Sequence, residues 1–286
     1  MLYPLSYGGS WCTSRWCTSR ISGDYGRAYA PSGKSMYVLK KPEAPYRLSP
    51  GVLLSGVGLA IKESSVPIQN PLEKYFRKNK KRLIHKWMHY FDIYHRYFAR
   101  FRGKRVAILE FGVFHGGSLE MWRNYFGRKA MIYGVDIDPR CKQFESKRMK
   151  IFIGDQEDRE FLRSIAAEIG PIDVVIDDGG HTMGQQIATF EEIYPKVSED
   201  GVFLIEDLHT SYRANYGGGY RKPGTFVEYA KNLVDQLNAW HSKEPGFAVD
   251  EFTKTTRSMH IYDSIIVFEK GIVAKPHAEK TGKPSL

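Results

Sequence analysis

Acidic side chains and a histidine follow two apolar runs of the sequence. One run ends in Asp177 and Asp178, and two glycines then lead to His181 (VIDDGGH). Another run ends in Glu206 and Asp207 (GVFLIED). Neighbouring carboxylates repel one another unless a cation neutralises them, and oxygen ligands favour Mg²⁺, with Mn²⁺ or Ca²⁺ as alternatives. Since a near-neutral imidazole can act as a general base, this pattern predicts a metal site with a base beside it.

Apolar runs that alternate with amphipathic segments must position these residues. We expect strands at residues 105–111, 130–136, 150–153, 172–177 and 201–206, and helices that end near 126 or cover 158–169 and 181–194. This alternation predicts a parallel, doubly wound sheet. Ligands of such sheets bind at the carboxyl ends of the strands, where both acidic pairs would meet.

The last two apolar runs almost touch. Residues 258–262 and 264–269 (SMHIYDSIIVFE) leave room only for a hairpin, which adds an antiparallel strand. We therefore predict an α/β, Rossmann-like fold with a seven-stranded, mostly parallel sheet, one antiparallel strand and helices on both faces.

The turn after the first predicted strand is rich in glycine (EFGVFHGGS, residues 110–118). Glycines here let a ligand approach the backbone near a helix N-terminus. The spacing is GxxxGG and not the dinucleotide-binding GxGxxG, and Glu110 suits an ammonium or sulfonium better than a diphosphate. Asp136 can accept hydrogen bonds from ribose hydroxyls, and Asp155, followed by Gln156, can bind an adenine amino group. Together they predict a pocket for an adenosine with a charged amino-acid tail.

Basic residues gather in the N-terminal third. Residues 1–104 contain 19 Lys/Arg and 5 Asp/Glu, whereas the rest contains 23 and 27. The cluster at 74–86 (KYFRKNKKRLIHK) would suit a nucleic acid or an anionic surface, but a solvated helix face is the preferred interpretation. Apolar residues recur at three- and four-residue steps, namely Ile84, Trp87, Phe91, Tyr94 and Phe98. This spacing predicts one amphipathic docking helix over residues 71–103.

The chain divides into four predicted regions. These are an irregular arm (1–70) with a WCTSR repeat at 11–20, the docking helix (71–103), the main domain (104–272) and a tail (273–286). We find no membrane-length apolar run, no secretory signal and too few cysteines for a disulfide framework. These features favour a cytoplasmic protein.

Five motifs together carry a family resemblance: EFGVFHGGSLEMW, YGVDID, GDQED, VIDDGGH and IEDLHTSY. They resemble the class I S-adenosylmethionine-dependent O-methyltransferases, in particular the Mg²⁺-dependent macrolide-sugar branch, of mycinamicin and tylosin type, which is related to the cephalosporin hydroxylase-like group. The resemblance covers residues 82–270 and implies the class I methyltransferase fold, whose last strand is antiparallel. It implies methyl transfer to a hydroxyl of a sugar or a glycosylated natural product. Residues 1–70 have no counterpart in it.

The resemblance also implies roles for residues. Mg²⁺, or Mn²⁺, would be held by Asp178, Glu206 and Asp207, with His181 as the general base. The expected contacts of S-adenosylmethionine are Glu110, Gly112, Ser118, Asp136, Asp155, Gln156 and Asp177. Candidate substrate contacts are His209, Tyr212 and Tyr216, the last beside a glycine run that suggests a mobile lid. We expect a small-molecule hydroxyl acceptor, a sugar, as the partner, a homo-oligomer, and neither nucleic acid nor membrane.

Other functions remain as alternatives. A catechol or an amine as acceptor would leave the fold unchanged, and a chelator would separate a metal-dependent enzyme from a metal-free N-methyltransferase. An NAD-dependent oxidoreductase is disfavoured by the GxxxGG spacing and the terminal hairpin. A non-catalytic binding module with a basic arm would be retained on heparin in a salt-dependent way.

Overall fold

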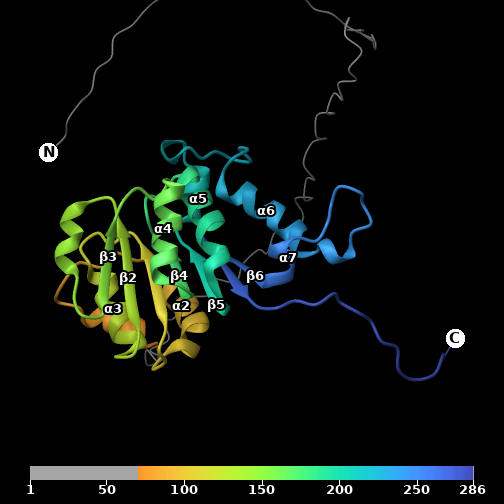
Figure 1. The fold of residues 1–286 in the computed structure, drawn as a ribbon, viewed down its shortest axis with the longest axis horizontal. Coiled ribbons are helices and arrows are strands. Elements are labelled where there is room, and N and C mark those ends of the chain that lie inside the picture. The colour runs from red at the N-terminus through yellow and green to blue at the C-terminus, as the bar shows by residue number, and fades with distance from the viewer. Residues whose placement is uncertain (1–69, 286) are drawn as a thin grey trace, which may run out of the picture. The chain divides into compact units, whose positions relative to one another are not determined.

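The structure is a computed structural model that describes residues 70–285, so the predicted arm at 1–69 and its WCTSR repeat lie outside the described residues. A seven-stranded sheet in the order β3-β2-β1-β4-β5-β7-β6 forms its centre (Figure 1). The strands are β1 (Ala107–Phe111), β2 (Met131–Asp136), β3 (Met149–Ile153), β4 (Ile172–Asp177), β5 (Val197–Ile205), β6 (Thr256–Tyr262) and β7 (Ile265–Lys270). Neighbours from β3 to β5 are parallel, whereas β7 is antiparallel to β5 and β6. The predicted mostly parallel sheet with one antiparallel strand is confirmed.

The predicted hairpin closes the sheet. Only Asp263 and Ser264 separate β6 from β7, and Ser264 has the left-handed φ of 63° that two-residue hairpin turns favour. As a result, β7 lies between β5 and β6 in the sheet.

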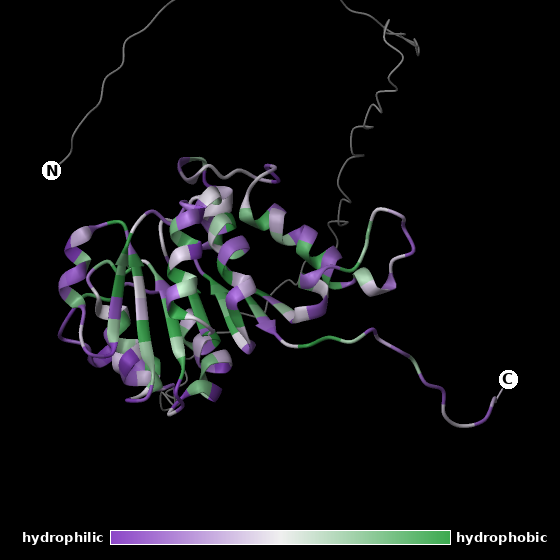
Figure 2. Cartoon of the chain, viewed as in Figure 1, coloured by the Kyte–Doolittle hydropathy of each residue, from purple (hydrophilic) through white to green (hydrophobic). Residues whose placement is uncertain are grey.

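Two helical layers cover the sheet because successive strand residues point to opposite faces. Ile108, Val174 and Leu204 pack with α1 (Pro71–Lys78), α2 (Tyr90–Phe98) and α3 (Gly117–Phe126). Residues next to them in the same strands pack with α4 (Arg159–Ile169), α5 (Met183–Ile193) and α6 (Phe226–Leu237), while α7 (Glu251–Thr255) precedes β6. Figure 2 shows apolar strands between helices whose outer faces are hydrophilic. Within residues 70–285, no helix has the length and apolarity needed to span a membrane.

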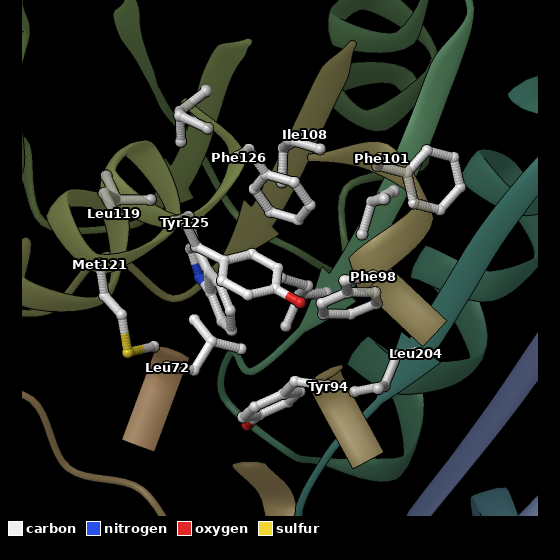
Figure 3. Packing of buried hydrophobic residues seen from close by; sticks show 14 of the residues in the cluster. Leu72, Tyr94, Phe98, Phe101, Ile108, Leu119, Met121, Tyr125, Phe126 and Leu204 are labelled. Carbon is white, nitrogen blue, oxygen red and sulfur yellow. The ribbon is translucent and has the colours of Figure 1, made fainter. Parts of the chain in front are cut away.

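Aromatic side chains fix α2 to the sheet (Figure 3). Tyr94 stacks on Phe98 with ring centroids 5.8 Å apart, and Phe98 meets Trp122 of α3 edge to face at 5.9 Å. These side chains are fully buried. Burial of each large apolar side chain stabilises the fold by about 1.5–3 kcal/mol, so this cluster holds the chain that precedes α2 in a fixed place.

The prediction of a single docking helix over residues 71–103 is wrong. The structure has two helices, α1 and α2, and residues 79–89 between them lie almost entirely outside helices. Asn79 ends α1, and its side-chain amide donates to the Arg82 carbonyl at 2.7 Å, which turns the chain. Ile84 and Trp87 therefore lie in a loop that crosses the carboxyl end of the sheet, where it lines a cavity.

Candidate functional site

A cavity of about 660 Å³ lies at the carboxyl ends of the parallel strands. Its walls come from the loops after β1 to β5 and from residues 83–87. Nine predicted site residues line it: Gly112, Ser118, Asp136, Asp155, Gln156, Asp178, His181, Glu206 and Asp207. Three of the four residues of the acidic pairs, Asp178, Glu206 and Asp207, therefore line the same cavity as the glycine turn.

Two predicted cofactor residues, Glu110 and Asp177, lie behind the cavity wall. Glu110 is fully buried and accepts hydrogen bonds from Ser118 Oγ at 2.7 Å and Trp122 Nε1 at 2.9 Å. Asp177 is also fully buried and accepts from Gln156 Nε2 at 2.6 Å. Burial raises the pKa of each carboxyl to about 7. Their direct contact with a cofactor stays a prediction, and in this structure both support residues that do line the cavity.

The glycine turn is folded onto the end of β4. Gly112 has a φ of 88°, and a Cβ there would lie 1.9 Å from the Asp178 carbonyl oxygen, so only glycine fits. Asp136 Oδ2 accepts from the Val113 and Phe114 amides, both at 2.9 Å. The carboxylate predicted to bind a ribose therefore also shapes the glycine turn.

The third strand end is held in a similar way. Asp155 Oδ1 accepts from the Glu157 amide at 2.9 Å. Gln156 is buried, and its Oε1 accepts from the Gly180 amide at 3.0 Å. Gln156 thus joins the loop after β3 to the loop that carries His181.

Asp178, His181 and Asp207 meet at the other side of the cavity. His181 Nε2 lies 3.5 Å from Asp207 Oδ2 and 3.8 Å from Asp178 Oδ1. His181 and Asp207 both have left-handed backbones, with φ of 58° and 55°. Such conformations cost about 1–3 kcal/mol each for residues other than glycine and persist where surrounding contacts impose them.

Two hydroxyl groups hold these strained residues. Thr210 Oγ1 donates to the His181 carbonyl at 3.1 Å, and Tyr90 OH donates to Asp207 Oδ1 at 2.7 Å. Burial lowers the pKa of His181, although Asp178 and Asp207 oppose the shift. The imidazole is therefore neutral at pH 7, as a proton acceptor or a metal ligand must be.

The donor atoms of Asp178, His181 and Asp207 all lie within 4.8 Å of one another. Metal–ligand distances in proteins are about 2.0–2.6 Å, so a single divalent cation can contact all three donors. The residues present therefore fit a metal. Glu206, the remaining predicted ligand, is not part of this group, and its two carboxylate oxygens lie 2.9 and 3.0 Å from Lys86 Nζ.

Lys86 corrects the interpretation of the basic cluster. Lys80 and Lys81 are exposed as predicted, but the Lys86 side chain is only 2% exposed and contacts three carboxylates. Tyr90 was not among the predicted site residues either. No local pattern separates Lys86 from its basic neighbours, and Tyr90 falls among apolar residues that pack a helix.

The three candidate substrate residues do not lie together. His209 and Tyr212 line a second, largely apolar cavity of about 470 Å³ between α6 and the β6–β7 turn. His209 Nδ1 lies 4.0 Å from Asp207 Oδ1, so this cavity adjoins the acidic group. Tyr216 lines neither cavity.

The glycine run beside Tyr216 is packed against the preceding turn. The Gly219 amide donates to the Ser211 carbonyl at 2.8 Å, and the Gly218 amide donates to Arg213 at 2.9 Å. A Cβ on Gly218 would lie 2.3 Å from the Thr210 carbonyl oxygen. In this conformation the loop is folded on residues 208–213, and its opening as a lid stays a prediction.

Comparison with known proteins agrees with this geometry. A family model described as a methyltransferase domain matches residues 109–208, which run from β1 to the acidic pair after β5. This part of the chain is therefore similar to a methyltransferase domain. Its sheet order and terminal hairpin are those of the class I methyltransferase fold, which confirms the predicted fold class.

Curated proteins resemble a longer part of the chain than the domain model matches. The 8-demethyl-8-(2-methoxy-alpha-L-rhamnosyl)-tetracenomycin-C 3'-O-methyltransferase of Streptomyces olivaceus is 38% identical over 200 residues, which cover 65% of this chain and 50% of the relative. Mycinamicin VI 2''-O-methyltransferase of Micromonospora griseorubida is 34% identical over 201 residues, or 65% of this chain and 49% of the relative. The chain thus spans about half the length of these curated relatives.

A solved structure shows the same likeness. The MycE methyltransferase from the mycinamycin biosynthetic pathway, in complex with Mg and SAH, matches with a TM-score of 0.62 and 31% identity over 71% of this chain and 54% of MycE. The resemblance to macrolide-sugar O-methyltransferases that the motifs indicated is therefore present in both sequence and fold.

Proposed function

We propose that this protein is a metal-dependent O-methyltransferase that transfers a methyl group from S-adenosylmethionine to a hydroxyl of a sugar on a natural product. The observation that carries the proposal is the group of Asp178, His181 and Asp207 beside the glycine turn of a methyltransferase domain. The names of the relatives support the acceptor, since they describe methylation of rhamnosyl and related glycosides.

The cofactor would occupy the part of the cavity near β1, β2 and β3. Gly112 leaves space for a ligand near the backbone, Asp136 lies where ribose hydroxyls are expected, and Asp155 and Gln156 lie where the adenine is expected. A cavity of about 660 Å³ lies in the range of small-molecule sites. The bound cofactor supplies the methyl group on a positively charged sulfur.

Asp178 and Asp207 are the proposed metal ligands in the conformation described, and Glu206 can join them if it leaves Lys86. A bound Mg²⁺ or Mn²⁺ would lower the pKa of the acceptor hydroxyl and stabilise its developing negative charge. A sugar with two neighbouring hydroxyls suits such a site because it offers two oxygen donors.

His181 is the proposed general base. Its lowered pKa leaves the imidazole ready to take the hydroxyl proton, and Asp207 Oδ2 at 3.5 Å stabilises the imidazolium that results. The strained backbone of His181, held by Thr210, fixes the direction of the ring. The acceptor oxygen can then attack while its proton leaves.

The second cavity supports an acceptor with an apolar body. Its lining includes Leu208, Val227, Val234 and Ile266, and His209 separates it from Asp207. A sugar at the acidic group would place an attached ring system near this apolar surface. Cytoplasmic location and homo-oligomer formation stay predictions.

The test is methyl transfer by the full chain with S-adenosylmethionine labelled in its methyl group. The acceptors are a rhamnosylated polyketide, a catechol and a primary amine, each with Mg²⁺, with EDTA, and with Mg²⁺ restored. We expect label on a sugar hydroxyl, lost with EDTA and regained with Mg²⁺. Label on the catechol or amine alone, or transfer that EDTA does not affect, would contradict the proposal.

A further inference from the structure

A lysine occupies the centre of the acidic residues at the ends of β1, β4 and β5. Lys86 Nζ lies 2.5 Å from Asp178 Oδ2, 2.9 Å from Glu206 Oε2 and 3.8 Å from Glu110 Oε1. We call Lys86, Glu110, Asp178 and Glu206 the charged cluster. Its members are largely inaccessible, since Lys86 is 2% exposed and Glu110 and Glu206 are 0% and 1% exposed at their side chains.

The cluster has one positive charge for three carboxyl groups. The Lys86 ammonium lies within 3.8 Å of all three carboxyl groups, so it is paired with each of them. Asp178 and Glu206 also line the cavity, so the carboxyl groups that Lys86 holds face the proposed metal site. A divalent cation that binds Asp178 or Glu206 must therefore share that carboxylate with Lys86.

Asp178 connects the charged cluster to the proposed metal ligands. Its Oδ2 faces Lys86, whereas its Oδ1 faces His181 Nε2 at 3.8 Å. The same carboxylate therefore has a monovalent cation on one side and the position for a divalent cation on the other. Glu206 is bound by Lys86 through both oxygens and has none directed to that position.

The loop that carries Lys86 is fixed by packing. A Cβ on Gly117 would lie 2.2 Å from the Leu83 carbonyl oxygen, so the loop rests directly on the start of α3. Arg82 pairs with Glu120 at 3.3 Å and lies 4.5 Å from the Phe144 ring centroid. The contacts with α3 hold the loop before Lys86, and the aromatic packing of α2 holds the chain after it. Lys86 is thus held in place from both sides.

We propose that Lys86 is a built-in cation that competes with the divalent metal for Asp178 and Glu206 and so weakens metal binding to a set level. The inference rests on the proposed metal-dependent function. Two cations a few ångströms apart repel each other, and the carboxylate oxygens that Lys86 holds are not available to the metal. Such a site releases its metal more readily than one in which Asp178 and Glu206 are free of Lys86.

The test is a titration of the full-length protein with Mn²⁺ alone, followed by the electron paramagnetic resonance signal of free Mn²⁺. Lys86→Met removes the charge and keeps the length of the side chain, and Lys81→Met removes an exposed charge from the same loop. We expect Lys86→Met to bind Mn²⁺ about tenfold more tightly or better. We expect the affinity of Lys81→Met to stay within about twofold of the wild-type value, because exposed charges are screened.

Thermal unfolding of the same proteins gives a second measurement. Without metal, Lys86→Met should melt at a lower temperature because its buried carboxylates lack a partner. Mn²⁺ should then raise its melting temperature more than that of the wild type. If Lys86→Met does not fold, Lys86→Gln, which keeps a hydrogen-bond donor, should show the same two changes.

The outcomes separate this inference from the proposed function. Equal or weaker Mn²⁺ binding by the folded Lys86 variant, with binding by the wild type, would overturn the competition and leave the metal site in place. Absence of Mn²⁺ binding by both proteins would overturn the metal site and the inference with it.

Discussion

The two sides of the main cavity are built differently. On the side of β1, β2 and β3, polar side chains bind nearby backbone groups, as Asp136 binds the amides of Val113 and Phe114. On the side of β4 and β5, charged side chains are held by other side chains far away in the sequence. Lys86 is 92 residues from Asp178 and 120 from Glu206, and Tyr90 is 117 residues from Asp207.

The side near β1, β2 and β3 is therefore a preformed binding surface. On the side near β4 and β5, the arrangement depends on a balance between charged side chains. The hydrogen bonds on the cofactor side run from backbone amides to the carboxylates of Asp136 and Asp155, and they form with the fold. The metal side contains carboxylates whose mutual repulsion is reduced by a lysine and a tyrosine. We therefore expect substitutions on the metal side to affect catalysis, and substitutions on the cofactor side to affect mainly cofactor affinity.

Asp178→Ala should have the largest effect. It removes the carboxylate shared by the charged cluster and the proposed metal ligands, and we expect methyl transfer to fall by roughly 10⁴-fold or more. Mn²⁺ binding should weaken by more than about 100-fold, because even partners outside the ligand shell contribute 10- to 100-fold. Methyl transfer and Mn²⁺ titration measure both effects. Asp235→Ala, at an exposed position of α6, is the control, and wild-type Mn²⁺ affinity in Asp178→Ala would refute the assignment.

His181→Ala should reduce the turnover number by roughly 10³-fold, within the usual contribution of a general base. The affinity for S-adenosylhomocysteine should remain, since the residues near β1 to β3 are untouched. Single-turnover kinetics and calorimetry distinguish the two quantities. His241→Ala replaces an exposed histidine far along the chain and should behave as the wild type. Equal turnover in His181→Ala and wild type would exclude the base.

The same residue predicts a pH dependence. The base form of His181 exists above its pKa, and burial lowers that pKa below the ordinary value of about 6.5. Activity should therefore persist at pH 6.5 and be lost only as the pH falls through the lowered pKa. A kcat/KM profile with its acid limb above pH 7 would contradict this assignment.

Asp136→Asn should weaken S-adenosylhomocysteine binding by about 10- to 100-fold. It removes the charge from hydrogen bonds that contribute about 1.5–3 kcal/mol each, and it disturbs the glycine turn. Mn²⁺ binding should stay unchanged, which calorimetry can establish in parallel. The control is Asp158→Asn at the N-cap of α4, where asparagine caps equally well. A loss of Mn²⁺ affinity in Asp136→Asn would show that the two sides are not separate.

Tyr90→Phe should have the smallest effect. It removes the hydroxyl that donates to Asp207 and leaves the ring packing, so we expect Mn²⁺ affinity and turnover to fall by about tenfold. Tyr125→Phe removes a hydroxyl bonded to His95 on α2, outside the site, and provides the matched comparison. If the two variants behave alike, Tyr90 has no role in positioning Asp207.

The sequence predicted the parts of the molecule that depend on local patterns. The strand ends at Phe111, Asp136 and Asp177 were placed correctly because apolar runs stop there and glycine or acidic residues follow. The two-residue hairpin at 263–264 was also evident from spacing alone. The glycine turn and three of the four residues of the acidic pairs, Asp178, Glu206 and Asp207, reached one cavity because a parallel sheet brings its strand ends together.

The errors have a common physical origin in contacts between distant residues. The apolar spacing of Ile84 and Trp87 fits a helix, but the loop they occupy is determined by α3 and by the acidic residues beneath it. Lys86 differs from Lys81 only through carboxylates about a hundred residues away. Glu110 and Asp177 were placed at the correct strand ends, but which side of the cavity wall they occupy depends on Trp122 and Gln156.

Calorimetric titration of the full-length protein with S-adenosylhomocysteine, with and without Mg²⁺ and with NAD⁺ as control, tests the central claim most directly. The account predicts micromolar-range binding of S-adenosylhomocysteine under both conditions, since the cofactor side does not depend on the metal, and no binding of NAD⁺. NAD⁺ binding without S-adenosylhomocysteine binding, or no binding of either, would contradict it.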